Sequence, residues 1–146
     1  MEYTQGSIGR IFLLKFNHGD DIHHELRALV KKERIQSAVL LFIGALKQGH
    51  LVTGPKKALI PPEPNWASFQ DGWETLGMGT IFQGKKGAKT HIHVSMGKKD
   101  KVMTGCLRKS SEVFLVIEAV VFELNGMKAG KEVDAKTGLE MLKIYP

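Results

Sequence analysis

The chain has 146 residues, of which 42% are apolar and 25% are charged. This composition excludes a disordered or low-complexity protein, and the length favours one domain spanning residues 1–146. The longest apolar stretch, residues 38–46, is about half the length of a membrane span, and the N-terminus lacks the order of a signal peptide. We therefore expect a cytoplasmic protein that enters no membrane.

Basic residues outnumber acidic residues by 21 to 15, which gives a formal net charge of +6. Most of the excess lies between residues 85 and 109, where the only acidic residue is Asp100 and the basic residues are Lys85, Lys86, Lys89, Lys98, Lys99, Lys101, Arg108 and Lys109. Such a cluster suits DNA or another anionic partner, and it is also typical of a solvated rim that keeps a protein soluble.

The first third of the chain predicts strand, helix and strand in turn. Residues 8–16 form a dense apolar run typical of a strand covered on both faces. Asp20 is predicted to cap a helix whose apolar face carries Ile22, Leu26, Leu29 and Val30. His23 and His24 fall on the polar side of that helix, so we expect both to be surface residues.

Most of the remaining chain reads as strands. Residues 54–68 contain four of the five prolines and predict a loop. Strands are expected on both sides of it, at residues 39–46, 49–53, 73–82, 90–96, 101–107 and 113–124, with a last one at 139–145. One main helix and about seven strands joined by short connections indicate an α+β fold with a central, mainly antiparallel sheet.

A possible metal site involves two of these strands. His91 and His93 are two residues apart on a predicted strand, so their side chains share a face. A hairpin with Met96 opposite Lys101 would place the lone cysteine, Cys106, opposite His91 on that same face. Two imidazoles and a thiolate can hold zinc, with a fourth position left for water, a carboxylate or a ligand. The prediction requires an even-length turn, because a slip of one residue turns Cys106 away.

Other interpretations of these residues remain open. Two strand histidines and a cysteine can be ordinary residues of a partly buried face. Glu74 and Glu118 are the carboxylates that could join a metal site. Glu118 interrupts the apolar run 113–121, and a salt bridge, for example to Arg10, would explain it without a metal.

Seven short segments follow one another along the chain: Gly9-Arg10, Gly19-Asp20-Asp21, Ile43-Gly44-Ala45-Leu46, Trp73-Glu74-Thr75-Leu76, Gly79-Thr80-Ile81, His91-Ile92-His93-Val94 and Gly105-Cys106-Leu107. In this order they resemble the PPC domain, the plants and prokaryotes conserved domain, over nearly the entire chain. The resemblance implies an α+β unit with a mainly antiparallel sheet that assembles as a homotrimer.

The resemblance also implies a metal site, generally zinc, formed in prokaryotic members by the His-x-His strand and a later Gly-Gly-His-Leu motif. The matching positions are His91, His93 and Cys106, with cysteine standing where the family has histidine. The family's association with DNA comes largely from plant proteins in which an AT-hook precedes the domain, and no such arm is present in this sequence.

Three functions are therefore considered. The first is a trimeric PPC-domain binding or assembly module that carries zinc and contacts DNA or another anion. The second is a zinc-dependent enzyme for a small anionic substrate, with Glu74 or Glu118 moving protons. The third is a protein-contact module without metal.

Overall fold

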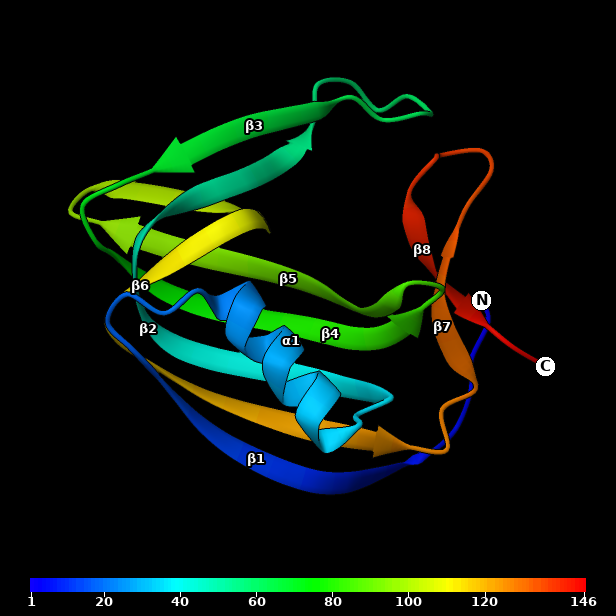
Figure 1. The fold of residues 1–146 in the computed structure, drawn as a ribbon. Coiled ribbons are helices and arrows are strands. Elements are labelled where there is room, and N and C mark those ends of the chain that lie inside the picture. Colours follow the sequence, from blue (N-terminus) through cyan, green and yellow to red (C-terminus); the bar gives the residue numbers. More distant parts are fainter.

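The computed structural model describes residues 1–146 and contains one helix and eight strands. In chain order the elements are β1 (Ser7–Asn17), α1 (Ile22–Glu33), β2 (Ser37–Pro55), β3 (Pro64–Phe69), β4 (Trp73–Gly84), β5 (Gly87–Lys98), β6 (Lys101–Asn125), β7 (Ala129–Val133) and β8 (Glu140–Ile144). Figure 1 shows them as a strongly curved sheet with the helix lying across it. This is the α+β architecture predicted from the sequence.

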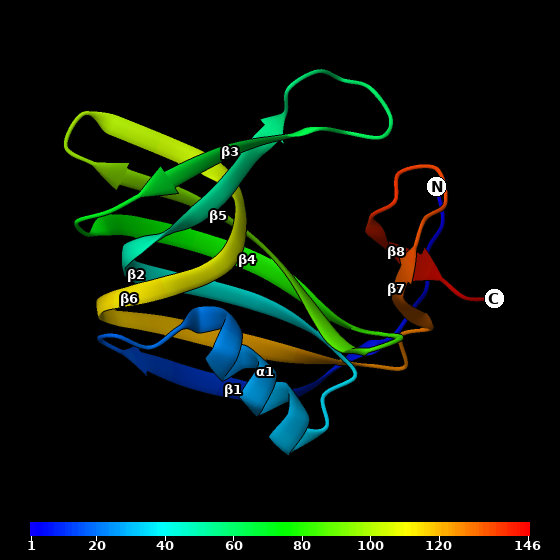
Figure 2. The same ribbon diagram turned by 45° about the horizontal axis from the view of Figure 1, so that its top comes forward.

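The sheet closes partly on itself. Its strand order is β3-β2-β6-β5-β4-β7-β8, with β1 added beside β6, and β2 also pairs with β4. Strands β2, β6, β5 and β4 therefore form a closed circuit, whose curvature is visible in Figure 2. All ladders are antiparallel except a single parallel pairing between β4 and β7.

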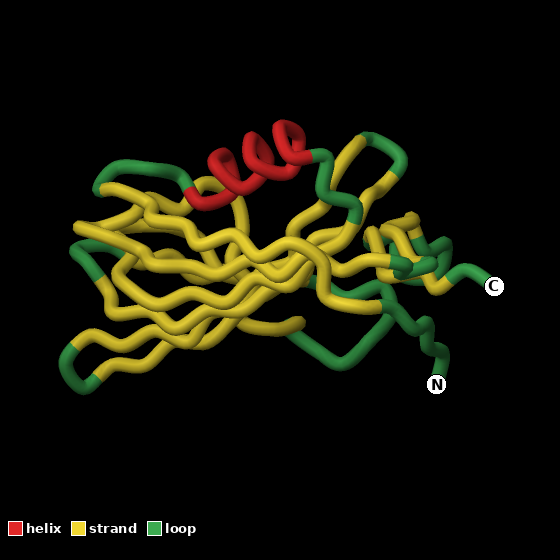
Figure 3. Tube along the Cα trace, turned by 90° about the horizontal axis from the view of Figure 1, so that it is seen from below, coloured by secondary structure: helices red, strands yellow, loops and turns green.

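Helix α1 covers the inner face of this curved sheet. Its apolar side chains Ile22, Leu26 and Val30 are buried in the core. The capping residue is Asp21 rather than the predicted Asp20: the Asp21 carboxylate accepts a hydrogen bond of 2.8 Å from the backbone N–H of His24. Asp20 instead accepts from the backbone N–H of Asn17 at 2.7 Å. Figure 3 shows the helix on one side of the sheet and no element covering most of the other.

Two pairs of predicted strands are continuous in the structure. The predicted strands 39–46 and 49–53 both belong to β2, and 101–107 and 113–124 both belong to β6. Two of the three shifts in the β2–β6 register lie in a predicted gap of β2 or β6, and Lys109 has a φ of 57° at one of them. The third, between Gly44 and Ala45, lies inside the predicted strand 39–46. Such bulges bend a strand without ending it, which is how β6 pairs with β5 at its start and with β1 further along.

The remaining differences lie in the loops. Strand β3 occupies part of the predicted 54–68 loop, and β7 was not predicted, whereas β8 confirms the expected last strand. The one helix, with 12 residues, is too short to cross a membrane.

Candidate metal centre

The centre lies at a fork between two strands. The β5–β6 ladder runs from Lys98 opposite Lys101 to His93 opposite Cys106, and β6 then leaves β5 to pair with β2. His91 and His93 project from the outer face of β5, while Ile92 and Val94, which alternate with them, are buried in the core. The strand period therefore explains why both imidazoles reach the fork.

The hairpin register differs from the predicted one by two residues. Met96 lies opposite Met103 rather than Lys101, because the turn contains only Lys99 and Asp100. Cys106 is consequently opposite His93, not His91, and Thr104 is opposite Ser95. A shift of two residues preserves the face on which each side chain lies, so the predicted convergence of His91, His93 and Cys106 is confirmed.

The geometry of the three side chains fits a metal ion. One ligand atom from each residue lies within 4.8 Å of the others, and the two Nε2 atoms of His91 and His93 are 3.1 Å apart. Two nitrogens bound to one tetrahedral zinc ion are separated by about 3.3 Å, given a Zn–N distance of about 2.0–2.1 Å. The cluster could therefore hold a metal with little rearrangement.

Burial sets the protonation chemistry of this cluster. Burial raises the pKa of the Cys106 thiol, while the charges of Arg108 and Lys131 act in the opposite direction. Burial also lowers the pKa of His91, and His93, Lys131 and Arg108 lower it further. A neutral imidazole can coordinate a metal directly, whereas the thiol must first lose its proton.

A pocket of about 460 Å³ opens over the cluster. Its walls come from the end of β2, the proline loop, β3 and the turn between β7 and β8. Besides the three candidate ligands it is lined by Val52, Gly54, Pro55, Pro62, Pro64, Trp66, Arg108 and Leu139. It is thus an apolar pocket with one permanently charged side chain.

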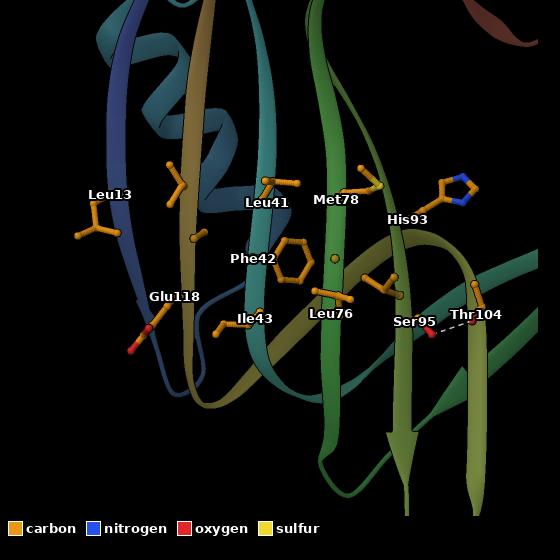
Figure 4. Close-up of a pocket in the computed structure, with 14 residues that line it drawn as sticks. Leu13, Leu41, Phe42, Ile43, Leu76, Met78, His93, Ser95, Thr104 and Glu118 are labelled. Atoms are coloured by element: carbon orange, nitrogen blue, oxygen red, sulfur yellow. Dashed lines mark hydrogen bonds between the residues drawn. The ribbon is translucent and has the colours of Figure 1, made fainter.

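Neither predicted carboxylate reaches this site. Glu118 pairs across the sheet with Ile43, which pairs with Leu76, which in turn pairs with Ser95 on β5. Three inter-strand spacings, about 14 Å, therefore separate Glu118 from β5, as Figure 4 illustrates. Glu74 is opposite Gly97, four residues or about 13 Å along β5 from His93.

The expected partner of Glu118 is also wrong. Glu118 is exposed, and Arg10 instead forms salt bridges with Glu123 at 2.7 Å and Glu33 at 3.1 Å. Glu118 and Glu74 share a separate pocket on the outer face with Ser95. The Glu118 carboxylate therefore needs no buried partner, because its side chain points outward from β6 into solvent.

The basic cluster is divided by the fold. Lys98, Lys99 and Lys101 lie at the β5–β6 turn, and Lys85 and Lys86 lie at the β4–β5 turn. These turns are at opposite ends of β5, about 35 Å apart along an extended strand of that length. Lys86, Lys89, Arg108 and Lys109 line a groove of about 820 Å³ together with Arg27 of α1.

The predicted surface position of His23 is wrong. This residue was expected on the surface with His24, but it is only 8% exposed, and its Nδ1 lies 3.2 Å from Oγ1 of Thr90. Its Nε2 is buried without a hydrogen-bond partner. Trp66, which lines the pocket, and Lys131, whose charge acts on His91 and Cys106, were also missed, because both come near the site only through the folding of β3 and β7.

A sequence model of the family described as the Plants and Prokaryotes Conserved (PCC) domain matches residues 3–125. A comparison with curated proteins finds no match.

Several solved structures share the fold. A metal-containing protein of Archaeoglobus fulgidus is 25% identical with a TM-score of 0.86, covering 98% of this chain and 99% of its own. A plant- and prokaryote-conserved (PPC) protein of Pyrococcus horikoshii is 25% identical with a TM-score of 0.84, and the match covers 100% of this chain and 99% of that protein. A protein of Bacteroides thetaiotaomicron named as a DNA-binding candidate is 20% identical with a TM-score of 0.78, covering 97% and 99%, a likeness of fold alone.

Proposed function

Because the chain belongs to the Plants and Prokaryotes Conserved (PCC) domain family, we propose that it is a zinc-binding assembly module with ligands His91, His93 and Cys106. The convergence of their ligand atoms within 4.8 Å is the observation that carries this proposal. A thiolate combined with two imidazoles is a donor set that favours zinc. The description of the similar Archaeoglobus protein as metal-containing supports a metal site in this fold.

Elemental analysis of protein purified without chelator tests the zinc site. We expect close to one zinc per chain in the parent protein and a large loss in His91→Ala and Cys106→Ser. Ser95→Ala is the matched control, because Ser95 is exposed on the same face of β5 and is not one of the three ligands. Less than about a third of an equivalent in the parent protein would contradict the proposal.

We propose that the assembly is a homotrimer formed through the outer face of the sheet. This face carries Leu13, Leu41, Ile43, Leu76 and Met78, each at least 42% exposed. Figure 4 shows these side chains on β1, β2 and β4, and they line an apolar hollow of about 700 Å³. Exposed apolar surfaces of this kind are typical of interfaces between protein chains. Light scattering of the purified protein should give the mass of three chains, and a monomer mass would exclude the trimer.

A second candidate function is binding of the DNA backbone in the basic groove beside α1. Lys86, Lys89, Lys109 and two arginines line it, and Asp21 is its only acidic residue. The Asp21 carboxylate is already engaged by the backbone N–H groups of His24 and Ser111. The groove therefore presents an excess of positive charge to phosphates, without groups arranged to read bases.

The salt dependence of binding to a random DNA duplex tests this function. The double variant Lys86→Ala with Lys109→Ala should reduce the slope of log K against log salt by about 1.8, given about 0.9 per lost contact. Lys98→Ala with Lys101→Ala removes the same charge from the other end of β5 and should change the slope much less. An absence of binding at low salt, or equal effects of the two double variants, would contradict DNA binding in the groove.

A further inference from the structure

The charge around the fork is unbalanced. Two neutral imidazoles and one thiolate leave a divalent metal ion with one uncompensated positive charge. No aspartate or glutamate lines the pocket over the three side chains. Arg108 lines this pocket, and the charges of both Arg108 and Lys131 act on Cys106 and His91. The site therefore carries several positive charges that no protein carboxylate in the pocket neutralises.

The positions of the two cations add to this imbalance. Lys131, on β7, is only 9% exposed and forms none of the salt bridges in the structure. Glu140, the carboxylate whose charge acts on it, is paired with Lys89 at 2.8 Å. Arg108 follows Cys106 by two residues on β6 and likewise has no carboxylate partner. Because a guanidinium binds carboxylates and phosphates with two parallel hydrogen bonds, an unpaired arginine on the wall of a pocket suits an anionic group.

The rest of the pocket is apolar. Trp66 of β3, three prolines and Leu139 supply most of its apolar lining. The volume of about 460 Å³ falls within the range of sites for small organic molecules. A free inorganic anion would leave this apolar wall without a contact, whereas an organic anion would cover it.

We propose that this pocket binds a small organic anion whose charged group completes the coordination of the metal and pairs with Arg108, while its apolar body packs against Trp66. The proposal rests on the zinc site proposed above. In this proposal Arg108 binds the charged group of the ligand, and Trp66 determines which apolar group the pocket prefers.

Replacing zinc with Co²⁺ gives a direct test, because the visible spectrum of cobalt responds to its ligands. Cobalt content is measured first, so that failure of the metal site is distinguished from failure of anion binding. Benzoate, acetate and the neutral benzamide are then titrated into the loaded parent protein. We expect benzoate to change the spectrum with the highest affinity, acetate to bind more weakly, and benzamide to have no effect.

Two variants test the assigned residues. Arg108→Met should weaken benzoate binding about tenfold or more, because a charge-assisted pair is lost. Arg27→Met is the matched control, since Arg27 is exposed and lines the groove beside α1 but not this pocket. Trp66→Ala should weaken the binding of benzoate and leave that of acetate nearly unchanged.

A cobalt-loaded parent protein whose spectrum does not respond to benzoate, or responds equally to benzamide, overturns the inference and leaves the metal site intact. Equal benzoate affinity in Arg108→Met and Arg27→Met overturns the role of Arg108. Failure of the parent protein to hold cobalt overturns the metal site and this inference together.

Discussion

His23 of α1 lies against Thr90 of β5, with 3.2 Å between the imidazole Nδ1 and the threonine Oγ1. Thr90 immediately precedes His91, so this contact joins the start of the helix to the strand that carries two candidate metal ligands. Burial lowers the pKa of His23, and Arg27 and Arg108 lower it further, whereas Asp21 raises it. The neutral imidazole is therefore the form that the fold stabilises.

We expect the stability of the protein to fall as the pH drops below about 6.5, the ordinary pKa of histidine in an unfolded chain. Between pH 6.5 and the lowered pKa of His23 in the folded protein, the unfolded chain binds a proton at His23 and the folded protein does not. This linkage costs at most about 1.4 kcal/mol per pH unit. Urea denaturation between pH 7 and pH 5 should show a flatter dependence in His23→Gln than in the parent.

The control is His24→Gln, which makes the same change at an exposed position of the same helix. It should keep the pH dependence of the parent. An identical loss of stability with falling pH in the parent and in His23→Gln would show that His23 does not contribute.

Removing the metal should destabilise the fork. A ligand present at 100 times its dissociation constant stabilises a protein by about 2.7 kcal/mol, which corresponds to a change in Tm of roughly 5–10 °C for a chain of this size. We expect EDTA to lower the Tm of the zinc-loaded protein by that amount in calorimetry. Cys106→Ser should be much less sensitive to EDTA, and equal sensitivity of the two proteins would place the stabilising metal elsewhere.

A charge on the outer face should prevent assembly. Met78, on β4, is 59% exposed in the apolar hollow, and a lysine there would have to be desolvated in the interface. Light scattering of Met78→Lys should give about one third of the parent mass. Leu59→Lys alters a residue of similar exposure, 66%, in the loop between β2 and β3 and should leave the mass unchanged. A trimeric Met78→Lys protein would move the interface away from this hollow.

Gly77 allows the ring of Phe42 to pack directly on β4. A Cβ atom at position 77 would lie only 2.0 Å from Cζ of Phe42, whose side chain belongs to the buried core. Gly77→Ala should therefore destabilise the fold by about 1–3 kcal/mol in urea denaturation. Gly97→Ala is the control, because its nearest contact would be the carbonyl oxygen of Lys101 at 3.9 Å. Equal stability of the two variants would show that the ring moves aside at little cost.

The parts of the site that depend on strand period were predictable from the sequence. His91 and His93 share a face because side chains alternate along a strand, and Cys106 joins them for any turn with an even number of residues. The sequence does not distinguish a two-residue turn at Lys99 and Asp100 from a longer one. It therefore placed Cys106 opposite the wrong histidine while keeping it on the correct face.

Features that depend on long-range packing were not predictable. His23 has the helical position of a surface residue, but its side chain is buried because the helix packs it against Thr90 of β5. The lysines from 85 to 109 are close in sequence, yet β5 separates them into two groups. Glu118 interrupts an apolar run because that run faces a partly exposed sheet surface, which a single sequence does not reveal.

X-ray absorption at the zinc edge tests most directly whether His91, His93 and Cys106 hold one ion. We expect one sulfur neighbour at about 2.3 Å and nitrogen neighbours at about 2.0–2.1 Å, with the sulfur lost in Cys106→Ser. A zinc-loaded parent protein with only nitrogen and oxygen neighbours would contradict this account.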